Sequence, residues 1–262
     1  MSTTAGNLHL SLHDIQRFGP DPLNTFKANL VKVEERIVSA CRRAGRDPRS
    51  VRLLPITKTV PAHILRLAFD AGIRNFGENR IQEAAGKRRV LGALPVEWTI
   101  VGHLQTNKVK YLTRFASAFH ALDSLRLADL LNTRLERESR LLDVYVQVNT
   151  SGEESKFGLE PDALLPFIET LHQFPHLRPR GLMTIAPLSQ DTERIRPCFR
   201  LLRRLRDEAV KRNPAIKELS MGMSSDFEQA IKDGADVVRV GQAIFGRRPT
   251  PDTDYWPNVV KR

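Results

Sequence analysis

A lysine follows the first strongly apolar segment of the chain. Residues 51–56 read VRLLPI, and Lys58 comes after them with one threonine between. A short apolar run bounded by polar residues is typical of a strand that is buried on both faces. A lysine amine at the end of such a strand can have a lowered pKa and attack a carbonyl carbon to form a Schiff base. Taken alone, Lys58 is more simply explained as the point where the strand leaves the core and meets water.

A second segment has the composition of a phosphate-binding loop. Residues 220–226 read SMGMSSD and combine a glycine with three serines, among them Ser224 and Ser225. Backbone N–H groups at such a turn, the start of the helix that follows and the serine hydroxyls suit a phosphate group. Gly241, which follows the last apolar run, would let the backbone approach the same ligand closely. An ordinary serine-capped helix is the alternative explanation.

The elements that must position these residues alternate between strand and helix. The predicted strands cover residues 52–58, 73–76, 97–101, 118–122, 143–148, 180–185, 218–220 and 236–240. Strict alternation of strands and helices predicts a parallel sheet. Eight such units over about 200 residues favour a closed (β/α)8 TIM barrel. A doubly wound open sheet is the alternative, and the lack of a glycine-rich fingerprint after the first strand counts against it.

We expect a single α/β domain with additions at both ends. Residues 1–22 are expected to form a flexible N-terminal extension. Residues 23–246 are expected to form the barrel together with an added N-terminal amphipathic helix, because apolar residues recur at three-and-four spacing from residue 24 to residue 45. Residues 247–262 are expected to form a C-terminal tail.

In a barrel of this kind the carboxyl ends of the strands form one mouth, where active sites lie. The residues expected there are Lys58, Asn79, His103, Asp123, Asn149, Thr184, Ser220 and Arg239. A lysine and a phosphate site in one mouth suit a phosphorylated aldehyde, and pyridoxal 5′-phosphate (PLP) fits. Arg239 would lie near the pyridine nitrogen, where an Asp or Arg partner is expected. An arginine is always charged and only donates hydrogen bonds, so it favours an unprotonated ring nitrogen and disfavours carbanion chemistry.

The composition excludes several other functions. A net charge of +11 and the arginine-rich residues 194–212 raise the possibility of nucleic-acid binding. However, the apolar residues of that segment fall at helical spacing, and no aromatic residues are interleaved to stack on bases.

No cluster of His, Cys and carboxylate residues has metal-ligand spacing, and His103 is expected to be a surface or supporting residue. No apolar run is long enough to cross a membrane and no secretory signal is evident, so we expect neither membrane nor nucleic-acid partners. The two cysteines, Cys41 and Cys198, indicate a reducing cytoplasm.

Seven motifs together resemble one family. They are ITKTVP from residue 56, FGENRIQEA from 76, GHLQTNK from 102, VNTSGEESKFGL from 148, GLMTIAP from 181, SMGMSSDFEQAI from 220 and VRVGQAIFG from 238. In this order, and over roughly residues 33–246, they resemble the pyridoxal phosphate homeostasis protein family (the YggS/PROSC group), which is related to the N-terminal barrel of alanine racemase. One departure is Thr57, which stands where a serine is more usual before the lysine; it keeps a hydroxyl at that position.

The resemblance implies a cytoplasmic, monomeric PLP-binding barrel that maintains PLP homeostasis without robust catalytic activity. It implies PLP-dependent apo-enzymes as possible partners. By position within the motifs, Lys58 resembles the lysine that forms the Schiff base and Arg239 the partner of the pyridine nitrogen. The residues that match the phosphate loops are Ser220, Met223, Ser224 and Gly241. Asn79 and Asn149 match positions that line the mouth.

Two enzymatic alternatives remain open at this point. A PLP-dependent amino-acid racemase of the alanine racemase type needs a second acid–base group, which in that enzyme comes from a partner's additional domain. The chain ends soon after the last predicted strand, and its three tyrosines, Tyr111, Tyr145 and Tyr255, fall in a helix, a strand and the tail. We therefore expect the second base to be absent. A class I aldolase-type barrel would explain Lys58 and the phosphate loop equally well but leaves Arg239 without a partner.

Overall fold

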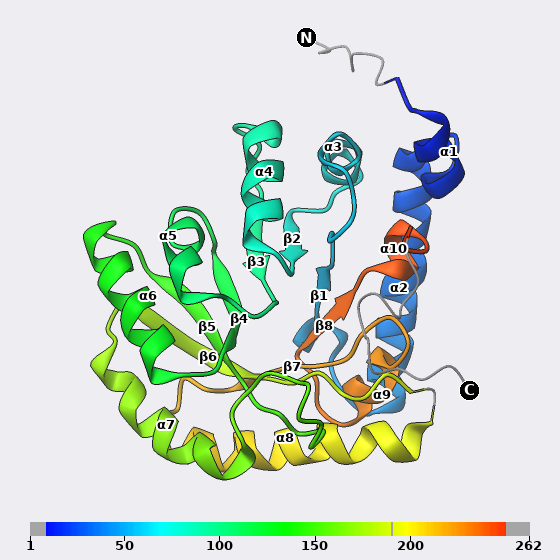
Figure 1. The fold of residues 1–262 in the computed structure, drawn as a ribbon. Helices are drawn as coiled ribbons and strands as arrows, with labels where there is room; N and C mark the ends of the chain where they lie inside the picture. Colours follow the sequence, from blue (N-terminus) through cyan, green and yellow to red (C-terminus); the bar gives the residue numbers. More distant parts are fainter. Residues whose placement is uncertain (1–8, 190, 250–262) are drawn as a thin grey trace.

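The computed structural model describes residues 9–189 and 191–249. In this part of the chain, eight parallel strands form one sheet that curls into a barrel, and helices cover its outside (Figure 1). The order in the sheet is β1-β8-β7-β6-β5-β4-β3-β2. Its ends meet at a parallel bridge between Ile56 and Gly77, where the Thr57 N–H group also donates to the Gly77 carbonyl at 2.8 Å. The predicted (β/α)8 barrel is confirmed.

The strands are short, as the sequence predicts. They are β1 (Arg52–Pro55), β2 (Asn75–Glu78), β3 (Glu97–Ile100), β4 (Ala118–Leu122), β5 (Leu142–Gln147), β6 (Leu177–Met183), β7 (Glu218–Ser220) and β8 (Val237–Val240). The helices of the barrel are α2 (Pro22–Arg43), α3 (Ala62–Asp70), α4 (Ile81–Leu91), α5 (Val109–Leu112), α6 (Leu125–Arg137), α7 (Leu164–Thr170), α8 (Thr192–Arg212), α9 (Phe227–Lys232) and α10 (Gln242–Phe245). Short 3-10 turns lie in the connections of the described chain: η1 (Pro48–Ser50), η2 (Thr106–Lys108), η3 (Pro161–Ala163) and η4 (Leu171–Gln173).

The first strand ends earlier than predicted. Ladder pairing of β1 with β8 stops at Pro55, and Lys58 lies in the turn that follows rather than on the strand. The backbone stays bonded to neighbouring strands as far as Thr57 and then turns at Lys58 and Thr59, where Thr59 has a positive φ of 66° that is incompatible with an extended strand. Lys58 is therefore carried by a turn, and the contacts of that turn decide where its amine lies.

The N-terminal segment also differs from the prediction. Where a flexible extension is predicted over residues 1–22, residues 12–18 form helix α1 (Leu12–Phe18). Its start is fixed by a capping box, in which the Asp14 N–H group donates to the Ser11 hydroxyl and the Ser11 N–H group donates to the Asp14 carboxylate. Phe18 at its end is buried against the ring of Phe26 on α2, with the ring centroids 6.0 Å apart. Residues 1–8 of the predicted extension and 250–262 of the predicted tail lie outside the described residues.

The arginine-rich helix α8 is part of the outer layer of the barrel. It runs along the lower edge in Figure 1 and contacts β6 and β7. Its apolar face is buried, and some of its arginines pair with carboxylates of neighbouring segments: Arg196 and Arg200 reach Asp233 at 3.5 and 3.7 Å, and Arg212 pairs with Glu169 on α7. These contacts favour the structural interpretation of the arginines over nucleic-acid binding. No helix in residues 9–189 and 191–249 is long and apolar enough to cross a bilayer.

Candidate functional site

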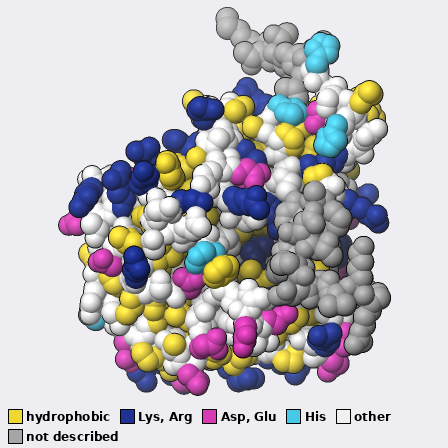
Figure 2. Space-filling view, in the orientation of Figure 1, with side chains coloured by type: hydrophobic (Ala, Val, Ile, Leu, Met, Phe, Trp, Pro, Cys, Tyr) yellow, Lys and Arg dark blue, Asp and Glu magenta, His cyan; other side chains and the backbone are white. Residues whose placement is uncertain are grey.

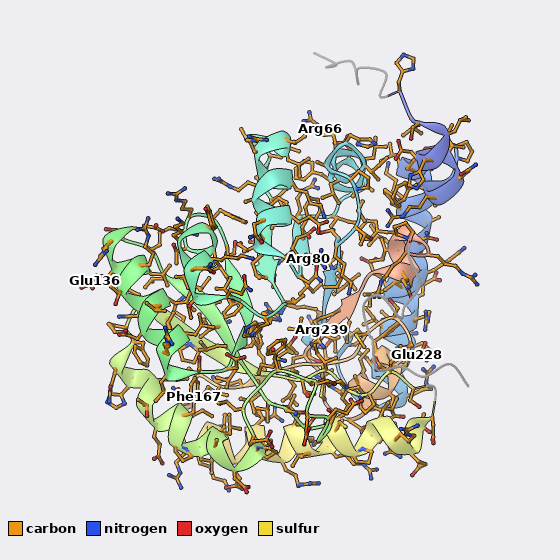
Figure 3. All side chains as sticks on the ribbon, viewed as in Figure 1. Arg66, Arg80, Glu136, Phe167, Glu228 and Arg239 are labelled. Carbon is orange, nitrogen blue, oxygen red and sulfur yellow. The ribbon has the colours of Figure 1, made fainter. Side chains whose placement is uncertain are left out.

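The carboxyl ends of the strands meet at one face of the barrel, as parallel strands require. Figure 2 shows that this side of the molecule is hollowed near its middle, and Figure 3, in the same orientation, places Arg239 there. The ends of β8 and β1 lie against each other at this point. A Cβ atom built on Gly241 would lie 3.0 Å from the Ile56 carbonyl oxygen, so this position has little space for a side chain. Gly241 therefore brings its backbone close to the turn that carries Lys58.

The residue before Lys58 is held by a buried ionic network. The Thr57 hydroxyl donates to Glu78 Oε1 at 2.5 Å, and Lys87 Nζ donates to the Thr57 carbonyl at 3.0 Å and to Glu78 Oε1 at 2.8 Å. Thr57 and Glu78 are fully buried and Lys87 is 6% exposed. Burial raises the pKa of the Glu78 carboxyl, and the Lys87 ammonium group opposes this shift. The network links β2 and α4 to the turn after β1.

The residue after Lys58 is held from the same helix. The Thr59 N–H group donates to Glu83 Oε1 at 3.1 Å, and Lys87 pairs with the same oxygen at 2.8 Å. Burial raises the pKa of the Glu83 carboxyl, but the hydrogen bond and charge of Lys87 outweigh it, so the pKa lies below its ordinary value. Lys58 itself is half-buried between these two fixed residues.

Arg239 is anchored in the barrel interior by oxygen acceptors that carry no charge. Its Nη1 donates to the Ser220 carbonyl at 2.6 Å and to the Ser220 hydroxyl at 3.0 Å, and its Nη2 donates to the Thr184 carbonyl at 2.7 Å. Burial lowers the pKa of the guanidinium to about 10, and the charge of Asp226 opposes this shift. Arg239 thus remains a buried cation at neutral pH, with its orientation fixed by two strands and their loops.

A neutral histidine contacts the same Ser220 hydroxyl as this arginine. His120 on β4 lies 3.0 Å from the Ser220 hydroxyl through Nδ1, and its ring packs on Tyr145 with the centroids 4.0 Å apart. Burial, followed by the charges of Arg239 and Arg52, lowers the pKa of His120 well below 6.5. The imidazole is therefore uncharged, which keeps a second cation away from Arg239.

The loop after β7 has the open donors that an anion requires. Gly222 adopts a φ of 92°, and the Met223 N–H group donates to Asp226 Oδ1 at 2.5 Å, which closes the loop. The Gly241 N–H group donates to the Ser224 hydroxyl at 3.2 Å and so joins the two loops. Among the described residues, the N–H groups of Ser224 and Ser225 meet no acceptor. Within the described chain, this loop thus has two backbone donors without an acceptor, and its Ser224 hydroxyl is bonded to Gly241.

The predicted site residues fall into two groups. Six lie at or just after the carboxyl ends of strands: Lys58 after β1, Asn79 after β2, Met223 and Ser224 after β7, Arg239 near the end of β8, and Gly241 directly after it. Asn79 is half-buried, and its side-chain amide meets no partner within the described residues. Ser220 differs from the prediction, because it is fully buried and its hydroxyl serves His120 and Arg239.

The side-chain amide of Asn149, predicted to line the mouth, makes hydrogen bonds within its own loop. Asn149 is 6% exposed, and its amide is used by its own loop: Nδ2 donates to the Glu153 carbonyl at 3.1 Å, and Oδ1 accepts from the Ser151 hydroxyl at 2.9 Å. The side chain fixes the course of the chain after β5. His103 and Asp123 form a pair at 3.4 Å after β3 and β4, and the His103 ring stacks on Phe157 with the centroids 3.9 Å apart.

Sequence reasoning misses the supporting residues. It does not single out Glu78 or Lys87, although Glu83 and Lys87 have the four-residue spacing of a helical ion pair. His120 lies inside a strand, and nothing in its neighbourhood in the sequence signals its contact with Ser220. No group of three His, Cys, Asp or Glu residues in the described part of the chain could hold a metal ion.

Comparisons with known proteins agree with this geometry. The family model of the alanine racemase N-terminal domain matches residues 29–249. A curated relative from Aquifex aeolicus, named pyridoxal phosphate homeostasis protein, is 45% identical over 84% of this chain and 96% of its own length. This chain belongs to the pyridoxal phosphate homeostasis protein family.

Solved structures extend the comparison. PipY of Synechococcus elongatus, a protein solved with PLP bound, is 35% identical, has a TM-score of 0.71 and is matched over 82% of this chain and 100% of its own. An alanine racemase of Clostridium difficile has the same TM-score of 0.71 at 14% identity, over 88% of this chain and 58% of its own. The second likeness shows a shared barrel fold alone. This site is therefore compared with the PLP homeostasis family rather than with the racemases.

Proposed function

We propose that this protein binds PLP in the mouth of its barrel, covalently through Lys58, and serves PLP homeostasis. The observation that carries the proposal is that Gly241, directly after β8, lies beside the Ile56 carbonyl near the Lys58 turn and is hydrogen-bonded to Ser224 of the loop after β7, while Arg239 of β8 is a buried cation two residues before it. The PLP bound by PipY and the names of the curated relatives support the same assignment.

The residues present fit this cofactor. The N–H groups of Ser224 and Ser225 and the Ser224 hydroxyl would hold the phosphate, and Gly241 provides the close backbone approach. PLP supplies an electrophilic aldehyde, which condenses with a primary amine with loss of water. Lys58 would supply that amine, and the fixed residues on both sides would orient it. Asn79, with its amide uncommitted, would provide a further polar contact in the mouth.

Arg239 and the positions of the tyrosines favour a binding protein over a racemase. A guanidinium only donates hydrogen bonds and cannot accept one from a protonated ring nitrogen, so Arg239 would favour the unprotonated nitrogen and weaken the ring as an electron sink. Tyr145 is 3% exposed inside the barrel, bonded to Arg52 and Glu218, and burial raises its pKa. Tyr111 is exposed on α5, and Tyr255 lies outside the described residues. Neither described tyrosine is placed as a second base.

The proposal extends to the setting of the protein. We infer a monomer in a reducing cytoplasm that passes PLP to apo-enzymes. Support for the compartment comes from Cys41 and Cys198, which are both buried free thiols, with pKa values raised by burial.

The test uses the colour of lysine-bound PLP. The purified protein incubated with PLP should show a visible absorbance band, and borohydride reduction should fix the label on Lys58 as read by peptide mass spectrometry. Lys58→Ala should lose both signals, whereas Lys32→Ala, an exposed lysine of α2, should keep both. A wild-type protein that stays colourless and unlabelled contradicts the proposal. Sustained racemisation of an amino acid by the purified protein would instead establish the enzymatic alternative.

A further inference from the structure

We propose that Arg17 of helix α1 is a positioning residue for Lys58: its guanidinium holds Thr59, the next residue of the turn, and so sets the direction of the lysine amine. The consequence for PLP rests on the proposed function. The hold on the turn is a property of the protein alone and is tested separately below.

Arg17 makes two hydrogen bonds to one residue. Its Nη1 donates to the Thr59 carbonyl at 2.6 Å, and its Nη2 donates to the Thr59 hydroxyl at 2.9 Å. Both bonds are partly buried and have a charged donor, which makes them stronger than bonds between neutral groups. The planar guanidinium places two donors side by side, a geometry that a lysine ammonium does not reproduce. The contact joins residues 42 positions apart in the sequence.

Thr59 needs this support because of its backbone conformation. Its φ of 66° lies in the left-handed region, where a β-branched residue is strongly disfavoured. Such a conformation persists only where the surroundings determine it. Glu83 accepts from the Thr59 N–H group, while Arg17 binds the carbonyl and the hydroxyl. All three polar groups of Thr59 are therefore engaged, one from α4 and two from α1.

Helix α1 is anchored firmly enough to present Arg17. Phe18, the next residue, is 2% exposed and packs edge-to-face on Phe26, whose ring lies 5.2 Å from that of Phe245 on α10. At the start of the helix, Asp14 is 4% exposed and lies 3.1 Å from His63 of α3. The helix is thus tied to both ends of the barrel chain and to the helix that follows the Lys58 turn.

The hold from α1 is an addition to the shared barrel. The family model begins at residue 29, after α1 has ended, so Arg17 lies outside the matched part. The contacts on the other side of the lysine, from Glu78 and Lys87 to Thr57, lie inside it. In this chain, the barrel itself fixes the residue before Lys58, and a helix outside the matched part helps to fix the residue after it.

Loss of Arg17 should increase the conformational freedom of the Lys58 side chain and leave the conformation of the loop over residues 221–226 unchanged. Thr59 would then relax toward negative φ, and the amine of Lys58 would sample more directions. The loop over residues 221–226 is closed by its own bonds, from Met223 to Asp226 and from Asp226 and Phe227 back to Met223. A ligand that needs the amine should therefore respond more strongly than one that needs only the phosphate donors.

The first measurement needs no cofactor. Hydrogen–deuterium exchange should be followed at the Thr59 and Val60 amides, which donate to Glu83 and to the Thr57 carbonyl. Arg17→Ala should speed exchange of both amides at least tenfold, which corresponds to about 1.4 kcal/mol, because both charged hydrogen bonds to Thr59 are lost. Arg42→Ala, at an exposed arginine of α2, is the matched control and should leave exchange unchanged. Unchanged exchange in Arg17→Ala overturns the proposal, whether or not the protein binds PLP.

The second measurement separates the amine from the phosphate loop. Colour development with PLP should slow about tenfold in Arg17→Ala, while the affinity for pyridoxine 5′-phosphate, which has an alcohol in place of the aldehyde, stays unchanged. Arg17→Lys should restore part of the rate. Phe18→Ala removes the ring that packs α1 on Phe26 but keeps Arg17, and it should slow colour development as Arg17→Ala does. Equal loss of both ligands in Arg17→Ala would show a general disturbance of the mouth and would overturn the positioning role.

Discussion

The turn that carries Lys58 and the loop over residues 221–226 reach the same mouth but are stabilised in different ways. The loop is local: Gly222 supplies the positive φ, and Met223 and Asp226 close it through their own hydrogen bonds. The turn has no glycine. Its positive φ falls on Thr59, and its contacts come from residues of α1, β2 and α4.

This difference has a physical meaning. A loop that is stabilised by its own backbone forms the same donor array wherever its strand and helix place it. A turn that is stabilised by distant side chains has the conformation that those side chains impose, and each of them is a point where the turn can be altered. The phosphate end of the mouth should therefore be robust, and the lysine end adjustable.

The largest expected effect comes from the buried ion pair below the turn. Glu78→Ala would leave the ammonium of Lys87 buried with Glu83 as its remaining carboxylate. Removal of one partner of a buried pair costs roughly 3–5 kcal/mol of unfolding free energy, and Glu83 should keep the loss near the lower figure. Urea unfolding monitored by circular dichroism measures it. Glu208→Ala, from an exposed pair with Lys211, is the control and should cost at most about 1 kcal/mol; equal losses in the two variants would contradict the prediction.

A smaller loss is expected when the loop is changed. A Cβ atom on Gly222 would lie 2.6 Å from Ala230 Cβ and 2.9 Å from Phe227 Cα, at a φ that disfavours any side chain. Gly222→Ala should therefore lower the unfolding free energy by about 2–3 kcal/mol and weaken phosphate binding. Gly86→Ala on α4, where a Cβ meets nothing within 4 Å, should instead raise it by about 0.5–1 kcal/mol. Equal changes in unfolding free energy for Gly222→Ala and Gly86→Ala would contradict the prediction.

The smallest effect concerns pH and the histidine below Arg239. The pKa of buried His120 is lowered well below 6.5, so below pH 6.5 the unfolded chain takes up a proton that the folded chain does not. Stability that is present above pH 6.5 should fall by about 1.4 kcal/mol per pH unit as the pH drops toward the folded pKa. Unfolding free energies at pH 7.5, 6.5 and 5.5 measure this slope. His120→Gln should flatten it by that amount, and an unchanged slope would show that His120 is not kept neutral.

The sequence is a good guide where the contacts are local. The apolar runs predict all eight strands to within a few residues, and β4 and β7 are predicted at their observed bounds. The glycine and serines of residues 220–226 predict a loop with open donors, because positive φ and free N–H groups follow from the residue types themselves. Lys58, Arg239 and Gly241 can be brought to one mouth because parallel strands share their carboxyl ends.

The remaining features depend on contacts that the sequence does not display. The turn after β1 contains Thr59 at a positive φ, and its polar groups are bonded to Arg17 and Glu83, which lie far from it in the sequence. Ser220 is expected in the phosphate loop, but as the last residue of β7 it points into the barrel, where His120 and Arg239 lie. Helix α1 is too short for a periodic apolar pattern, although the Ser11–Asp14 capping box is a readable sign of its start.

The interior of the barrel is filled from the opposite end, where Tyr145 is bonded to Arg52 and Glu218 and packs on His120. In the part of the chain that the structure describes, this packed interior leaves a molecule in the mouth no path through the barrel, so it enters and leaves on the same side. Exchange between two ligands must be sequential, with departure before arrival, and its rate is set by departure.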